Sequence, residues 1–119
     1  MTQKNSLSNG VGLGYKKCVA CEAGTPPLDR TEAEALLKQI QGWALSEDGT
    51  YISRTFTFKN FADALAFANK IGAVAEDEGH HPDLEVRWGH VVIRTSTHAI
   101  GGLSENDFIL AAKIDEIAT

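Results

Sequence analysis

The chain has 119 residues, of which 43% are hydrophobic and 23% charged, and its formal net charge is −5. This length is typical of one domain, and the apolar fraction is too high for a chain that is disordered throughout. The excess of 16 acidic over 11 basic residues argues against general binding to nucleic acid or to anionic membranes. No apolar run approaches the ~18 residues of a membrane helix, and no secretory signal is recognisable, so we expect a soluble protein of the cytoplasm.

The first 27 residues differ in composition from the rest of the chain. They are rich in Gly, Ser, Asn and Pro and lack apolar periodicity. This predicts a flexible N-terminal arm over residues 1–27 and one folded domain over residues 28–119. The arm contains both cysteines, Cys18 and Cys21, as Cys-Val-Ala-Cys. One such pair favours solvent-exposed thiols, with a redox pair or a zinc ion shared between chains as the alternatives.

Capping residues and apolar spacing predict a helix and then a hairpin at the start of the domain. Thr31 and Glu34 have the spacing of a capping box, and the helix that they begin should end near Gly42. The segment 43–58 has a Glu-Asp-Gly turn at 47–49 and alternates between apolar and polar residues after it. That pattern is typical of a β-hairpin, with the aromatic residues in the core.

A long helix and a second hairpin follow. Asn60 is the expected N-cap, and the helix should end near Gly79, because Pro82 disfavours a helical conformation in the residue before it. The second hairpin is predicted over residues 84–97, with its turn at Gly89. The buried stripe of the long helix should consist of the apolar residues at spacings of three and four, namely Phe61, Ala64, Leu65, Ala68, Ile71 and Ala75.

The last helix is predicted to begin at a capping box formed by Ser104 and Asp107, after the break at Gly101-Gly102. The order of elements is then α-β-β-α-β-β-α. Strands that come as hairpins form antiparallel sheets, so the expected fold class is α+β, a four-stranded antiparallel sheet with the helices on one face. A small open sheet leaves edge strands uncovered, which favours homo-oligomers.

Three of the four histidines are predicted to lie together. His80 and His98 are equally far from the central glycine of the second hairpin, so the pair His80-His81 enters the hairpin at the end from which His98 leaves it. Glu76 precedes His80 by four residues, and Asp77 precedes His81 by four. On a last helical turn these spacings would place one carboxylate beside each imidazole.

Imidazoles beside carboxylates are suited to general acid–base catalysis, because such rings can exchange protons near neutral pH. Two alternatives stay open. Adjacent histidines before a proline can be polar linker residues, and a helix C-terminus favours His for stability alone. Three His and a Glu can also ligate a metal ion, although no spacing such as His-Glu-x-x-His is present.

A set of residue types at fixed gaps spans the two hairpin ends and two helices: Glu76, His80, His81, Pro82, Trp88, Thr97, His98, Gly102 and Asp107. Over roughly residues 28–119 this pattern resembles the pterin-4a-carbinolamine dehydratases of the bacterial type. The resemblance implies dehydration of 4a-hydroxytetrahydrobiopterin to quinonoid dihydropterin and water, a lyase reaction without metal or other cofactor. It recycles the tetrahydropterin used by aromatic amino acid hydroxylases such as phenylalanine hydroxylase.

The same resemblance implies roles for individual residues. His80 and His98 would be the proton-transfer pair, His81 would bind the pterin and assist, and Glu76 would orient or tune His80. The residues implied to contact the substrate are His81, Asp107 and Trp88. The family also implies homodimers or homotetramers, and some animal members are dimerisation partners of a homeodomain transcription factor. A protein-binding role with a transcriptional regulator is therefore one alternative to catalysis, and a His-ligated metal enzyme is another.

Overall fold

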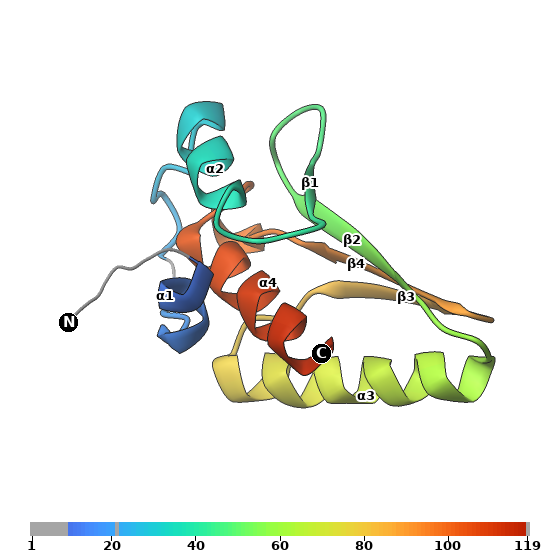
Figure 1. Cartoon of the computed structure of the whole chain (residues 1–119). Coiled ribbons are helices and arrows are strands. Elements are labelled where there is room, and N and C mark those ends of the chain that lie inside the picture. The colour runs from blue at the N-terminus through green and yellow to red at the C-terminus, as the bar shows by residue number, and fades with distance from the viewer. Residues whose placement is uncertain (1–9, 21, 119) are drawn as a thin grey trace.

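The computed structural model describes residues 10–20 and 22–118 and has an α+β fold, as the sequence predicts (Figure 1). The elements in chain order are α1 (Gly10–Tyr15), α2 (Arg30–Leu37), β1 (Ala44–Leu45), β2 (Ile52–Thr57), α3 (Phe61–Glu78), β3 (Asp83–Arg87), β4 (His90–Thr95), the 3-10 helix η2 (His98–Ile100) and α4 (Glu105–Ala118). All strand pairs are antiparallel and the sheet order is β1-β2-β4-β3. In the described part of the chain, no helix has the length and apolar character needed to span a membrane.

The first predicted helix begins and ends earlier than its spacing suggested. The N-cap of α2 is Asp29, whose carboxylate accepts the Glu32 amide at 2.8 Å while the Glu32 side chain accepts the Asp29 amide at 2.9 Å. The predicted Thr31–Glu34 box is therefore wrong by two residues, because Asp29-x-x-Glu32 satisfies the same pattern two residues upstream. The helix stops at Leu37, and Gly42, with φ of 82°, lies in the turn before β1.

Helix α3 agrees closely with its prediction. The Asn60 side chain accepts the amide of Asp63 at 2.7 Å, and the helix ends at Gly79 in the left-handed conformation with φ of 67°. The amide of His80 then donates back to the carbonyl of Ala75 at 3.2 Å, which completes a Schellman motif. The chain leaves the helix axis at this point, so His80 is directed away from the last helical turn.

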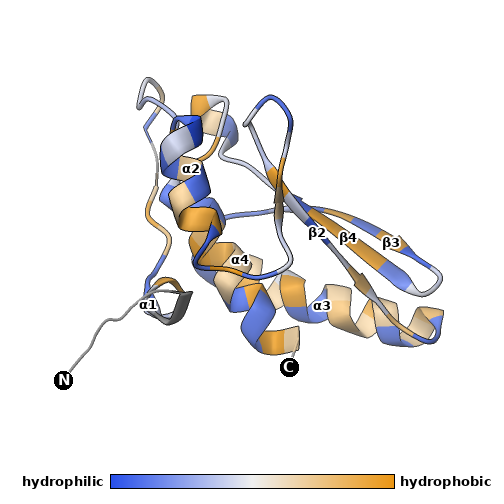
Figure 2. Ribbon diagram, turned by 45° about the horizontal axis from the view of Figure 1, so that its top comes forward, coloured by the Kyte–Doolittle hydropathy of each residue, from blue (hydrophilic) through white to orange (hydrophobic). Residues whose placement is uncertain are grey.

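The main core lies between the sheet and the helices, all of which are on the same side of it (Figures 1 and 2). Phe67 packs its ring against Phe56 and Phe58, with centroids 4.8 and 5.3 Å away. Phe61 and Leu65, expected in the buried stripe of α3, are instead exposed. The helix does turn most of the predicted stripe to the core, together with Phe67, and Phe61 and Leu65 lie at the edge of this buried face, where the described part of the chain leaves them exposed.

The expected arm contains a packed element. Helix α1 lies against α4, and Leu13 in its middle is buried. The prediction of an arm without packed structure is therefore wrong over α1. Helix α4 runs through the middle of the molecule (Figure 2), and because the run 108–112 is buried without interruption, it is apolar on more than one side. A helix of this kind must be covered on several sides, and α1 supplies one of the covers.

Candidate active site

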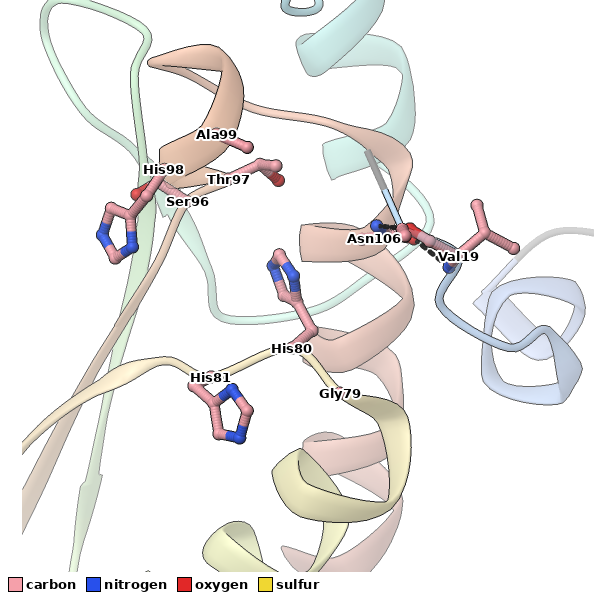
Figure 3. Close-up of a pocket in the computed structure, with 10 residues that line it drawn as sticks. Val19, Gly79, His80, His81, Ser96, Thr97, His98, Ala99 and Asn106 are labelled. Atoms are coloured by element: carbon pink, nitrogen blue, oxygen red, sulfur yellow. Dashed lines mark hydrogen bonds between the residues drawn. The ribbon is translucent and has the colours of Figure 1, made fainter. Parts of the chain in front are cut away.

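A cavity of about 230 Å³ opens where α3, β4, η2 and α4 meet (Figure 3). Its wall includes all three histidines of the predicted cluster, His80, His81 and His98. The shared hairpin end that places them together is confirmed, although the strand register differs by one residue from a reflection through Gly89. Arg87 pairs with His90 and Asp83 with Arg94, so the turn is centred between Trp88 and Gly89.

Asp107 is the most completely buried charged group of the site, with a fully buried side chain. Its Oδ1 lies 2.6 Å from His80 Nε2 and accepts from Thr95 Oγ1 at 2.6 Å. Its Oδ2 accepts from Thr97 Oγ1 at 2.8 Å and from the Ser104 amide at 3.0 Å. Four donors therefore surround two oxygens, which is the full complement of an ionised carboxylate. The last of these bonds is the reciprocal half of the predicted capping box.

The same hydrogen-bond network determines which ring nitrogen of His80 carries a hydrogen. Because Asp107 accepts three other hydrogen bonds, the hydrogen between the two side chains belongs to His80 Nε2. The His80 ring, only 11% exposed, then directs Nδ1 away from Asp107, and within the described part of the chain Nδ1 has no hydrogen-bond partner. A carboxylate that fixes the tautomer of an imidazole and stabilises its protonated form leaves the second nitrogen available for proton transfer.

The predicted pairing of Glu76 with His80 is wrong. Glu76 instead contacts His81, with Oε2 and Nε2 2.5 Å apart, and Asp77 contacts Lys17 at 3.5 Å. The i,i+4 rule holds only within a helix, and the left-handed residue Gly79 rotates both histidines off the helical path. The His81–Glu76 pair is open to solvent, with side chains 62% and 78% exposed.

His98 is exposed at the start of η2, on the opposite side of the cavity in Figure 3 from Asn106. The main chain around it is closed by the bridge between Thr97 and Gly102, in which the Thr97 amide donates to the Gly102 carbonyl at 2.7 Å. Trp88, by contrast, lies in the turn at the far end of the hairpin and is exposed. Within one chain the structure does not bring Trp88 to the cavity that holds His80.

Sequence reasoning missed one wall of the cavity. Val19 and Ala20 from the arm and Asn106 from α4 line it, together with Ser96 and Ala99. The available signal was indirect: an uninterrupted apolar run in α4 requires a covering segment, and the arm was the only unassigned part of the chain ahead of the domain.

Of the two cysteines, the structure describes only Cys18. Cys18 is half-buried, and its Sγ lies 3.5 Å from the carbonyl oxygen of Asn106. Burial, with Glu78 and Asp107 nearby, raises the pKa of the Cys18 thiol to about 12, which does not suit a reactive thiolate. Cys21 lies outside the described residues. Among the residues that the structure describes, no three or more His, Cys, Asp or Glu side chains are grouped to hold a metal ion.

Comparison with known proteins identifies the family. The model of the family described as pterin 4 alpha carbinolamine dehydratase matches residues 26–117. The chain belongs to this family. A protein of Methylococcus capsulatus, provisionally named pterin-4-alpha-carbinolamine dehydratase, is 50% identical over 106 residues, covering 89% of this chain and 93% of that protein. One from Nitrosomonas europaea, also provisionally named so, is 52% identical over 110 residues, covering 92% and 96%.

Solved structures agree with the fold. A transcriptional coactivator/pterin dehydratase from Brucella melitensis superposes with a TM-score of 0.74 at 30% identity, covering 78% of this chain and 99% of that one. A pterin dehydratase-like protein identified as a RuBisCO assembly factor in the alpha-carboxysome has a TM-score of 0.57 at 24% identity, covering 66% and 90%. At that level of identity the second likeness concerns the fold alone.

Proposed function

We propose that this protein dehydrates 4a-hydroxytetrahydrobiopterin, a pterin 4a-carbinolamine, to quinonoid dihydropterin and water. The observation that carries the proposal is the buried Asp107 carboxylate, which fixes the tautomer of His80 at the wall of a cavity that His81 and His98 also line. Membership of the dehydratase family supports the same reaction. The product would return to the tetrahydropterin pool of an aromatic amino acid hydroxylase such as phenylalanine hydroxylase.

The reaction needs one proton delivered and one removed. The C4a–O bond breaks as the hydroxyl takes up a proton and leaves as water, while the neighbouring ring nitrogen loses its proton and forms a double bond to C4a. Neutral His80 is suited to remove the proton through Nδ1, because Asp107 stabilises the imidazolium that results. His98 is suited to protonate the leaving hydroxyl, and its exposure allows it to take up a new proton from water.

His81 is assigned a supporting role. Its ring is exposed at the cavity rim and its Nε2 is occupied by Glu76. In this arrangement His81 would bind the pterin and assist proton transfer, and Glu76 would orient His81 rather than His80. The nitrogen lone pair of the carbinolamine can itself expel the protonated hydroxyl, so the proposed reaction uses no cofactor.

A stopped-flow absorbance measurement of carbinolamine decay, with EDTA-treated protein, tests this proposal. We expect the wild-type protein to accelerate the decay and His80→Ala to lose ~10²–10⁴-fold in kcat, the usual contribution of a positioned acid–base group. His90→Ala is the matched control, because His90 is exposed at the turn end of the hairpin and does not line the cavity. Folded wild-type protein without acceleration, or an equal loss in His90→Ala, would contradict the proposal.

A protein-binding role is the second candidate, favoured by the coactivator name of the Brucella melitensis relative. Self-association belongs to either candidate. Strands β1 and β3 are the edges of the sheet, and Phe61 and Leu65 form an exposed apolar pair on α3. Unpaired strand edges and apolar side chains of this kind favour a homodimer or homotetramer.

A further inference from the structure

The arm spans the gap between two helix ends that flank the cavity. We call residues 16–20 the strap. At one side of the gap, the amide of Cys18 donates to Glu78 Oε1 at 2.9 Å, and Glu78 is in the last turn of α3. At the other side, Lys16 Nζ donates to Glu105 Oε2 at 2.7 Å, and Glu105 is the first residue of α4. The strap therefore connects the end of the helix before His80 to the start of the helix that holds Asp107.

Asn106 holds the centre of the strap. Its Oδ1 accepts the Val19 amide at 2.9 Å, and its Nδ2 donates to the Val19 carbonyl at 2.5 Å (Figure 3). Asn106 is buried, with only 4% of the residue exposed. One amide side chain thus replaces both main-chain partners that a neighbouring strand would offer Val19. An interaction of this kind fixes both the position and the direction of the strap.

The held segment borders the same cavity as the histidines. Val19 and Ala20 line it together with Asn106, and in Figure 3 Val19 and His98 lie on opposite sides of His80. We infer that the strap, clamped by Asn106, is a substrate-binding wall of the active site and sets the affinity for the pterin. This inference rests on the proposed function, and it makes Asn106 a positioning residue that acts through Val19.

The contacts predict which kinetic constant should change. Asp107 is held by Thr95, Thr97 and Ser104, none of which belongs to the strap. The His80–Asp107 pair therefore keeps its partners when the strap is released, whereas the cavity loses one wall and opens to water. Loss of binding that is equal in the ground state and the transition state raises KM and leaves kcat nearly unchanged.

Asn106→Ala tests the inference by steady-state kinetics of carbinolamine decay. We expect KM to rise ~10-fold, as the loss of about one net hydrogen bond to a fixed wall would produce, with kcat within ~3-fold of wild type. Asn69→Ala is the matched control, since Asn69 is an exposed residue of α3 that does not line the cavity, and it should leave both constants unchanged. If KM is unchanged in Asn106→Ala while the wild-type protein turns over the carbinolamine, the inference that the strap binds substrate is overturned. The proposed function would be unaffected by that result.

Limited trypsin digestion separates release of the strap from damage to the fold. Cleavage after Lys16 or Lys17 should be faster in Asn106→Ala than in Asn69→Ala, and a stable 7,8-dihydropterin should slow it in the wild type. Faster cleavage without a rise in KM would mean that the strap docks but does not touch the substrate, which contradicts the inference. Absence of turnover by wild-type protein would instead overturn the proposed function, and the strap inference with it.

Discussion

Two histidines that are adjacent in the sequence each pair with a carboxylate. The two pairs have similar distances between nitrogen and oxygen but differ in burial. His80 Nε2 and Asp107 Oδ1 are 2.6 Å apart, and His81 Nε2 and Glu76 Oε2 are 2.5 Å apart. The first pair is nearly inaccessible to water and the second is open to it. Similar distances therefore do not mean similar contributions to stability. Removing one partner of a buried pair leaves a charged or polar group without a partner, whereas water replaces the lost partner at the surface.

The difference in burial also suits the two pairs to different chemical roles. The tautomer and orientation of the His80 ring are set before substrate arrives, since Thr95, Thr97 and Ser104 hold Asp107 in place. The exposed pair can rearrange when a ligand displaces water. A site of this design has one preorganised group for proton transfer and one adaptable group at its mouth.

The largest effect is expected from Asp107→Asn. The amide presents a donor where the carboxylate accepts, so at least one of the hydrogen bonds from Thr95, Thr97 and Ser104 or from His80 must be lost. We expect kcat to fall ~10²–10⁴-fold and the free energy of unfolding to fall by ~3 kcal/mol. Stopped-flow turnover and urea unfolding measure the two quantities.

Asp115→Asn is the control for this change, on the same helix. Asp115 Oδ1 accepts from Trp43 Nε1 at 2.9 Å and from Arg54 Nη1 at 2.8 Å, and it does not line the cavity. Its replacement should affect stability and leave kcat unchanged. Asp107→Asn with wild-type kcat would show that the buried pair is structural only, and the contrast between the two pairs would lose its catalytic meaning.

Glu78 provides an intermediate case, because its side chain is only 3% exposed but its partners are lysines. Burial acts to raise the pKa of this carboxyl, but the Cys18 amide, Lys113 and Lys17 together outweigh burial and hold the pKa below its ordinary value of 4.5. A carboxyl whose pKa is lowered on folding stabilises the fold above its unfolded pKa, and this contribution is lost as the pH falls through the folded pKa.

Glu78→Gln should therefore destabilise the protein by ~1 kcal/mol at pH 7 and by less at pH 3, because the contribution of the charge declines as the pH falls below the unfolded pKa of the carboxyl. Urea unfolding at the two pH values measures the difference. Glu34→Gln, which removes a surface ion pair with Arg30, should cost little at either pH. An equal loss at both pH values in Glu78→Gln would assign the effect to side-chain shape rather than to charge.

Much of this site follows from local sequence patterns. The hairpin end shared by His80 and His98 could be predicted because strand pairing depends on distance from the turn, and a shift of one residue does not separate them. The partner of His80 could not be derived from spacing, since Gly79 ends the helical geometry that the i,i+4 rule assumes. Asp107 was reached only through the resemblance to the family, as it is 27 residues away.

The polar network around Asp107 could have been expected from the position of two threonines, which rules of helical spacing do not consider. Thr95 and Thr97 continue the buried side of β4 after Val91 and Ile93, so two hydroxyls on an apolar face required a polar partner in the core. The packing of α1 could not be located from its composition, which is rich in glycine. Its position depends on the exposed side of α4, a property of the assembled fold rather than of the arm.

The smallest effect is expected from Glu76→Gln, which removes the carboxylate charge of the exposed pair. The Glu76 side chain is 78% exposed, so water replaces the lost charge and the free energy of unfolding should change by less than ~0.5 kcal/mol. Turnover should change only a few-fold, because His81 keeps its place before Pro82 and the His80–Asp107 pair is untouched. Urea unfolding and stopped-flow kinetics beside Asp107→Asn provide the measurement. A loss of kcat as large as that of Asp107→Asn would mean that the exposed pair is preorganised by the substrate, and that burial in the free protein does not rank the two carboxylates.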